Sequence, residues 1–209
     1  MKGTAPQKAA RLLINLALHP RYASRYVSNN LLHSRSPLDL ELPWFSYAAI
    51  DFLEDHLDPT MKVFEYGSGG STLFFARRVA SVVSVEDNPE WYNRVKERLA
   101  AEKISNAELR LFPFDFKEPA GFDSSDYLRS LAGERPQVIV VDGSEEWTQV
   151  RPICFQLAEN VIRAGGIIVV DDSWRYPGLR TNHRAKHVET FQSAGPGRPG
   201  VTSTDVFFY

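Results

Sequence analysis

Short runs of valine and isoleucine place the strongest constraint on how this chain folds. Two of them, PQVIVVDG at residues 136–143 and GGIIVVDD at 165–172, have an apolar centre with no polar alternation, and SVVSVE at 81–86 is largely β-branched. A strand that is apolar on both faces is buried on both faces, as in a parallel sheet covered by helices. The runs therefore predict an α/β protein with a mostly parallel sheet.

Helical segments are expected between these strands. Apolar residues recur at helical spacing over 43–57, and Pro89 suits the first turn of a helix over 90–102, with Asp87 or Asn88 as its cap. Further helices are predicted at 71–80, 124–132 and 148–166, and further parallel strands at 61–66 and 107–114. After a loop at 173–182, residues 185–192 and 202–209 predict two antiparallel strands joined by the turn SAGPGRPG.

Charge divides the chain into two parts. The first 38 residues contain six basic residues and no acidic one, whereas the remainder has 18 basic and 26 acidic residues. We interpret residues 1–40 as a basic helical extension, with a helix near 6–18 and an irregular stretch after it, and residues 41–209 as one domain. A lid over the site or a homodimer contact is the favoured role for the extension, and contact with an anionic membrane surface is the alternative.

Composition excludes several classes of function. The net charge of −2 argues against a general nucleic-acid binder, which needs a concentrated basic face. The chain has no apolar run of the roughly 20 residues that a membrane span requires, so stable membrane insertion is not expected. Cys154 is the single cysteine, which fits a reducing compartment, and the expected location is the cytoplasm.

The stretch VFEYGSGGSTLFFA at 63–76 indicates a ligand site. Gly67, Gly69 and Gly70 would let the backbone turn sharply and approach a ligand, and the next helix offers free N–H groups. A dinucleotide is disfavoured, because its G-x-G-x-x-G fingerprint lacks a glycine at Thr72 and Glu65 would repel a phosphate. Glu65 suits a cationic ligand, and a carboxylate at Glu86 can accept hydrogen bonds from ribose hydroxyls. The pattern indicates an adenosyl ligand with a cationic tail.

Four segments together carry a family resemblance. In order and spacing, FEYGSGGS, VVSVEDN, PQVIVVDG and GGIIVVDD resemble the class I S-adenosylmethionine-dependent methyltransferases. The resemblance covers residues 60–209 and departs from the commonest loop only in its third glycine, which comes one place early. It implies a Rossmann-like, seven-stranded, mostly parallel sheet with a C-terminal antiparallel hairpin and helices on both faces. It also implies a methyltransferase that uses S-adenosylmethionine, bound by Glu65, Gly67, Ser68, Gly69, Ser71, Glu86, Asp87, Asp115 and Asp142.

Three carboxylates end the fourth and fifth predicted strands, namely Asp142, Asp171 and Asp172. Oxygen ligands suit a hard cation such as Mg²⁺. The arrangement resembles the metal-dependent O-methyltransferases of the catechol and macrolide-sugar types, which implies Mg²⁺ on these three residues and a small-molecule acceptor, a hydroxyl of a sugar or natural product. The alternative is that the carboxylates cap helices or contact the cofactor without binding a metal.

The general base is open at this stage. Sugar-modifying relatives have a histidine two residues beyond the DG that follows the fourth strand, where this chain has Glu145. Glu145, Glu146, His183 and His187 are candidates, with His183 preferred, and Asp142 and Glu145 complete the expected catalytic set. Trp174 and Tyr176 are expected to contact the acceptor. The alternative functions are a metal-independent N- or carboxyl-methyltransferase and a non-catalytic module that binds S-adenosylmethionine.

Overall fold

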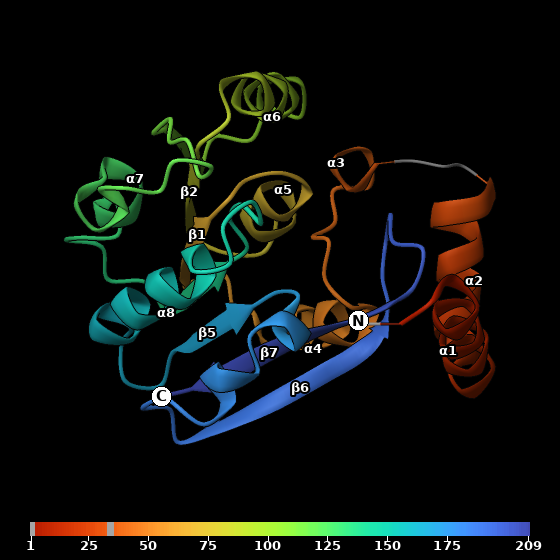
Figure 1. Ribbon diagram of the computed structural model, residues 1–209. Coiled ribbons are helices and arrows are strands. Elements are labelled where there is room, and N and C mark those ends of the chain that lie inside the picture. Colours follow the sequence, from red (N-terminus) through yellow and green to blue (C-terminus); the bar gives the residue numbers. More distant parts are fainter. Residues whose placement is uncertain (1–2, 33–35) are drawn as a thin grey trace.

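A single mixed sheet organises the computed structural model, which describes residues 3–32 and 36–209. Within those residues the sheet has seven strands in the order β3-β2-β1-β4-β5-β7-β6 (Figure 1). The strands are β1 (Lys62–Tyr66), β2 (Ser81–Glu86), β3 (Ala107–Leu111), β4 (Val138–Val141), β5 (Ile167–Val170), β6 (His187–Ala194) and β7 (Val201–Phe208). The first five are parallel, and β7 runs antiparallel to both β5 and β6. The predicted fold class and C-terminal hairpin are confirmed.

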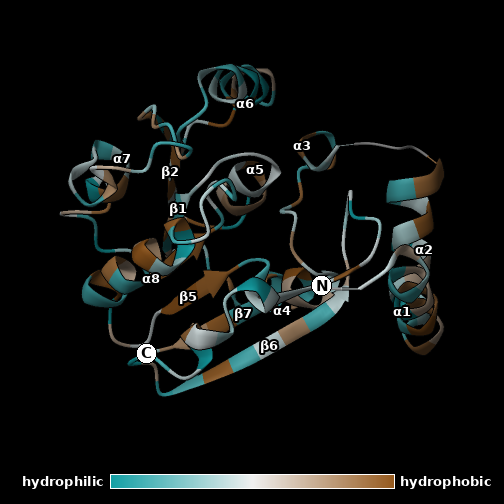
Figure 2. Cartoon of the chain, viewed as in Figure 1, coloured by the Kyte–Doolittle hydropathy of each residue, from teal (hydrophilic) through white to brown (hydrophobic). Residues whose placement is uncertain are grey.

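The centre of the sheet is apolar on both faces. All residues of β4 and β5 are buried valines and isoleucines, and β5 is coloured as strongly hydrophobic in Figure 2. Phe64 of β1 lies opposite Val83 on one side and Ile139 on the other. Burying one such side chain stabilises the fold by about 1.5–3 kcal/mol, so these valine and isoleucine runs hold the strand ends in fixed positions.

Helices cover both faces of the sheet, as predicted. One core cluster joins α4 (Tyr47–His56) and α5 (Gly70–Ala76) to the sheet, and a second joins α7 (Asp126–Arg129) and α8 (Val150–Val161) to its other side. The helix α6 (Pro89–Ala101) begins where Pro89 was expected to begin it. Its cap is Asn88, whose side chain accepts a hydrogen bond from Trp91 N at 3.0 Å.

The β6–β7 turn reaches back to the segment before α4. A Cβ on Gly195 would collide with the carbonyl of Phe45, and Arg198 Nε donates to Trp44 O at 2.7 Å. This turn therefore brings the C-terminal hairpin against residues that precede the first strand. The predicted loop at 173–182 contains two short 3-10 helices instead, η3 (Ser173–Arg175) and η4 (Pro177–Arg180).

The N-terminal extension is more regular than expected. The helix α1 (Ala5–Leu18) matches its prediction, but the stretch predicted to be irregular contains α2 (Pro20–Tyr26), the π-helix η1 (Val27–Leu32) and the short α3 (Pro37–Leu40). That prediction was wrong because Pro20 can start a helix and because Tyr22 and Tyr26, one turn apart, are both buried in the core. Residues 33–35 of that stretch lie outside the described residues.

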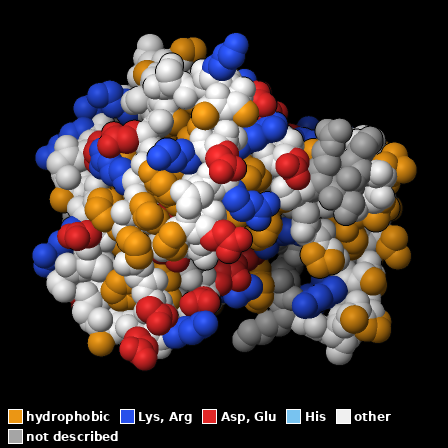
Figure 3. All heavy atoms as spheres, turned by 90° about the horizontal axis from the view of Figure 1, so that it is seen from above, with side chains coloured by type: hydrophobic (Ala, Val, Ile, Leu, Met, Phe, Trp, Pro, Cys, Tyr) orange, Lys and Arg blue, Asp and Glu red, His pale blue; other side chains and the backbone are white. Residues whose placement is uncertain are grey.

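The extension forms one edge of the molecule. In Figure 1 α1 and α2 stand on the right, beyond the end of β6 at which the β6–β7 turn begins. In Figure 3 hydrophobic side chains gather along this same edge. No helix in the described part of the chain is long and apolar enough to cross a membrane.

Candidate functional site

A cleft of about 790 Å³ lies at the carboxyl ends of β1, β2 and β4. Its walls come from the loop after β1, from the residues that follow β2, β3 and β4, and from the segment before α4. Strand β1 pairs with β2 on one side and with β4 on the other. Successive strands are therefore added on one side of β1 up to β3 and on its other side from β4 onward. Ligands of open parallel sheets bind at such a switch point.

The glycine loop is held between two parts of the chain. Gly67 has a φ of +97°, and a Cβ there would lie 2.7 Å from the carbonyl oxygen of Asp142. A Cβ on Gly70 would collide with the carbonyl oxygens of Pro37 and Leu42. Glycine is therefore required at both positions by close backbone contacts, and the loop from Gly67 to Ser71 lines the cleft as predicted.

Glu86 ends β2 at the mouth of the cleft. Its Oε2 accepts a hydrogen bond from Ser68 Oγ at 2.6 Å, and its Oε1 accepts from the backbone N–H groups of Asn88 at 3.0 Å and Asp87 at 3.2 Å. Burial raises the pKa of Glu86, and these hydrogen bonds oppose that rise. The carboxylate is thus fixed in orientation. Because it lines the cleft, it can accept hydrogen bonds from a ligand.

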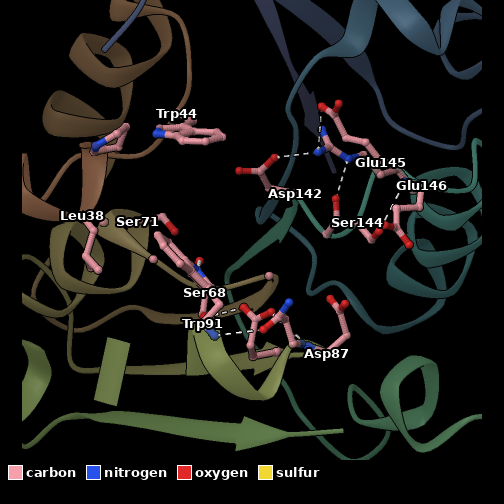
Figure 4. Close-up of a pocket in the computed structure, with 18 of the residues that line it drawn as sticks. Leu38, Trp44, Ser68, Ser71, Asp87, Trp91, Asp142, Ser144, Glu145 and Glu146 are labelled. Atoms are coloured by element: carbon pink, nitrogen blue, oxygen red, sulfur yellow. Dashed lines mark hydrogen bonds and ion pairs between the residues drawn. The ribbon is translucent and has the colours of Figure 1, made fainter. Parts of the chain in front are cut away.

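Trp91 is a residue of the cleft wall that the sequence analysis did not single out. Its indole Nε1 donates to Ser68 O at 2.8 Å and its ring lines the cleft beside the glycine loop. Figure 4 shows the two residues in contact, with Asp87 nearby. Burial, followed by the charge of Glu86, raises the pKa of Asp87 to about 7. The available signal was the position of Trp91, in the first turn of the helix that follows the acidic end of β2.

Glu65 does not lie where the sequence analysis placed it. Its side chain is buried, it does not line the cleft, and its carboxylate accepts hydrogen bonds from the hydroxyls of Thr72 and Ser84. Burial raises its pKa to about 7, against the effect of these two hydrogen bonds. Glu65 therefore joins β1, β2 and the start of α5 beneath the loop, and the expected contact with a cationic ligand is not available to it.

Asp142 and Glu145 follow β4 on the opposite wall. Asp142 Oδ1 is 3.0 Å from Arg151 Nη2, and Glu145 Oε2 is 2.8 Å from Arg175 Nη2. Burial raises the pKa of both carboxyl groups. In Figure 4 the carboxylate of Asp142 points toward Trp44 across the cleft. Two predicted catalytic residues, with the missed Arg151, thus form one end of the cleft.

The three predicted metal ligands do not form a site that fits Mg²⁺. Arg198 Nη2 is 2.6 Å from Asp171 Oδ2, and its Nη1 is 3.0 Å from Asp172 Oδ1. Thr204 and Thr202 also donate to these two carboxylates, while Asp142 pairs with Arg151. A cation would have to displace two guanidinium groups. Among the residues that the structure describes, no group of three His, Cys, Asp or Glu side chains could hold a metal ion.

His183 lies away from the cleft. Its ring packs edge-on against Phe207 of β7, with ring centroids 5.3 Å apart, and it is absent from the cleft wall. His187 likewise stacks on Phe208. The histidine preference for the base is therefore wrong, because the residues after η4 fold back along the sheet edge instead of over the cleft.

The remaining predicted residues divide between the cleft and its surroundings. Asp115 lines the cleft, as do Trp44 and Phe114. Trp174 lines a second, smaller pocket, and Tyr176 is buried beside α8, so neither is in the main cleft. Pro37, Leu38, Leu42 and Trp44, from the segment before α4, also line the main cleft.

Comparisons with solved structures find similar folds among methyltransferases. The O-methyltransferase TomG from Streptomyces achromogenes, involved in tomaymycin synthesis and solved with S-adenosylmethionine, matches with a TM-score of 0.63 and 17% identity over 90% of this chain and 95% of its own. The O-methyltransferase from Bacillus cereus, solved with S-adenosylhomocysteine, matches with a TM-score of 0.59 and 18% identity over 90% and 97%. This chain has the methyltransferase fold.

The same fold serves different acceptors. An rRNA methylase from Streptococcus thermophilus matches with a TM-score of 0.56 and 14% identity, over 77% of this chain and 93% of its own. No protein-family model and no curated protein matches the sequence. The comparisons therefore establish the fold, and the acceptor has to be inferred from this chain's own residues.

Proposed function

We propose that this protein transfers the methyl group of S-adenosylmethionine to a hydroxyl oxygen of a small molecule such as a sugar or natural product. One observation carries the proposal: a single cleft contains the glycine loop and Glu86 at one end and the ion pair of Asp142 and the buried Arg151 at the other. The first end suits an adenosyl ligand without phosphate, and the second suits removal of a proton.

Each wall of the cleft has a part in binding the methyl donor. Glu86, held by Ser68, is oriented to accept both ribose hydroxyl protons. The loop from Gly67 to Ser71 can approach the methionine part closely, because its backbone carries little side-chain bulk. Asp87, Asp115 and Phe114 lie on the side where the adenine would be bound.

Asp142 is the proposed general base. As the acceptor oxygen attacks the methyl carbon, the carbon–sulfur bond breaks and S-adenosylhomocysteine leaves, while the hydroxyl proton passes to the carboxylate of Asp142. Burial raises the pKa of this group, and the charge of Arg151 opposes that rise; a raised pKa makes a carboxylate a stronger base. Arg151, at 3.0 Å, keeps the carboxylate in one orientation. Alignment of the three reacting atoms supplies much of the remaining rate.

Methyl transfer is proposed to proceed without Mg²⁺, since arginines occupy the carboxylates that would bind it. A nitrogen or carboxylate acceptor is the second candidate. A neutral amine or a carboxylate can attack the methyl carbon without first losing a proton, whereas a hydroxyl group has to lose its proton during the transfer. Neither of these acceptors would therefore depend on Asp142 as a base as strongly as a hydroxyl does. The effect of removing the Asp142 carboxylate therefore discriminates between these acceptors.

Calorimetry tests the binding half of the proposal. We expect the unaltered protein to bind S-adenosylhomocysteine and not NAD, and Glu86→Gln to bind roughly 10- to 100-fold more weakly, because hydrogen bonds to a charged group contribute about 1.5–3 kcal/mol. Glu90→Gln, an exposed change in the next helix turn, is the matched control. Tight binding of NAD, or equal affinity in both variants, would refute the proposed site.

A turnover assay tests the chemical half. With a panel of hydroxylated acceptors, we expect Asp142→Asn to lower kcat by roughly 10²- to 10⁴-fold, while added chelator leaves the rate unchanged. Loss of activity in chelator and its recovery with Mg²⁺ would show that the arginine pairs open in the working enzyme. Turnover only with amine or carboxylate acceptors would establish the second candidate.

A further inference from the structure

The helix α1 is apolar on two opposite sides. Leu12 and Leu16 pack against the core, and Asn15 Oδ1 accepts a hydrogen bond from Ala194 N at 3.0 Å, so this side faces the sheet. Leu13, Ile14 and Leu18 are 67%, 60% and 71% exposed. With Ala10 and Ala17 they follow the i, i+3, i+4, i+7, i+8 spacing of a single stripe on the outer side.

The outer stripe continues on the next elements. Val27, Leu31 and Leu32 of η1 are 40%, 65% and 71% exposed. With Leu13, Ile14 and Leu18 they make up six of the seven exposed large hydrophobic residues in the described chain, the seventh being Trp44 of the cleft. We call these six the N-terminal apolar face; they belong to the edge where hydrophobic side chains gather in Figure 3. Exposed apolar patches of this kind mark interaction sites.

The surroundings of this face are positively charged. The first 38 residues contain no acidic residue. Arg21, with 70% of its side chain exposed, follows α1, and Lys8 and Arg11 are exposed on it. Lys8 and Arg11 also line the second pocket, of about 250 Å³, together with Arg175 and Arg198. The one acidic residue of that pocket, Asp172, is paired with Arg198.

We propose that the N-terminal apolar face docks onto an anionic lipid bilayer, with its leucines and isoleucine among the acyl chains and Arg11 and Arg21 at the headgroups. Burial of apolar side chains and attraction between basic side chains and anionic headgroups together hold an amphipathic helix in a membrane surface. A second copy of the chain fits this face less well, because symmetric pairing would bring the basic segments of two copies together, and Asp51 beside Arg21 and Arg25 offsets only part of their charge. The anionic headgroups neutralise the same charges.

Vesicle sedimentation of the full-length protein tests this proposal. The probes are vesicles of phosphatidylcholine alone and of phosphatidylcholine mixed with phosphatidylglycerol. We expect binding to the anionic vesicles and much weaker binding to the neutral ones, with a decrease at high salt. L13Q/I14Q/L18Q should reduce the partition coefficient roughly a hundredfold by removing three inserting side chains. R11Q/R21Q should reduce it roughly tenfold or more.

The control for lost charge is K62Q/K96Q, which removes two exposed lysines outside the extension and should bind like the unaltered protein. Circular dichroism and light scattering report folding and oligomeric state for every variant. The proposal is overturned if neutral and anionic vesicles bind equally or if the unaltered protein binds neither. It is also overturned if the protein is a dimer that L13Q/I14Q/L18Q converts to a folded monomer, which would assign the face to a second copy.

Discussion

Glu65 shows how one buried carboxyl group can make stability depend on pH. Its pKa is about 7 in the folded protein and close to 4.5 in an unfolded chain, because burial disfavours the charged form. The folded state therefore binds a proton more tightly than the unfolded state. The stability that Glu65 contributes is fully present below pH 4.5 and is lost as the pH rises toward 7.

We expect Glu65→Gln to remove this pH dependence. The difference in unfolding free energy between the variant and the unaltered protein should shift by up to about 3 kcal/mol in favour of the variant between pH 4.5 and pH 8. Urea unfolding at both pH values measures it. Glu90→Gln, an exposed change, should show no such shift, and a constant difference for Glu65→Gln would mean that the carboxyl group titrates normally.

Glu65 and Glu86 differ in how much of their surroundings could be predicted from the sequence. The position of Glu86 was predictable, because Asn88 and Pro89 mark the end of β2 and the start of α6. The surroundings of Glu65 were not, since they depend on the register that sets it opposite Ser84 and on the packing of Thr72 from α5. Arg198 was missed for the same reason: it lies 26 residues beyond Asp172, in a turn whose direction a sequence does not fix.

At the scale of elements, the β6–β7 turn connects the sheet to the segment before α4. Arg198 donates to both Asp171 and Asp172 and to Trp44 O. We expect Arg198→Ala to lower the unfolding free energy by about 3–5 kcal/mol at neutral pH, because it leaves two buried carboxylates without their partner. Arg198→Lys should recover only part of this, since one ammonium group cannot bridge both carboxylates.

Urea unfolding measures the change, with Arg129→Ala as the control. Arg129 is exposed on α7, and substitutions of this kind usually change stability by less than about 0.5 kcal/mol. An equal effect of the two alanine variants would show that the carboxylate pairs contribute nothing to stability.

The glycine loop and the segment before α4 are coupled through backbone contacts. Any side chain on Gly70 would collide with the carbonyl oxygens of Pro37 and Leu42, so the segment must move. We expect Gly70→Ala to destabilise the protein by about 1–3 kcal/mol and to weaken ligand binding. Gly178→Ala is the matched control, because a Cβ there meets no atom within 4 Å. Equal stabilities in urea would mean that the segment yields without cost.

Elements were predictable where pattern and packing agree. The bounds of β2 were predicted residue for residue, since its β-branched run ends at turn residues. The residues of α2 belong to the polar stretch after residue 18 that was predicted to be irregular. Two buried tyrosines decide otherwise, and their burial depends on contacts with the distant β6 and α4.

At the scale of the molecule, the sheet order places the cleft at the carboxyl end of β1. The succession of strands and helices was predictable from the sequence, and the seven-stranded, mostly parallel sheet was implied by the family resemblance. The acceptor end did not follow, because its wall combines residues 37–44 with the β6–β7 turn, more than 150 positions away in the sequence. The extension likewise contributes to the main core, where Tyr22 stacks on Tyr47 with ring centroids 5.9 Å apart. Part of the predicted extension is thus packed as an integral layer of the domain.

This packing predicts that substitutions at two residues of the extension change the unfolding free energy by very different amounts. Tyr22→Ala should lower the unfolding free energy by about 3 kcal/mol, because it leaves a cavity beside Tyr47 in the core. Leu13→Ala, on the outer side of α1, should change it by less than about 0.5 kcal/mol, since Leu13 is 67% exposed. Urea denaturation of both variants without lipid measures the contrast. A small effect of Tyr22→Ala would mean that the extension folds apart from the sheet, whereas a large effect of Leu13→Ala would mean that its outer side is already covered in solution.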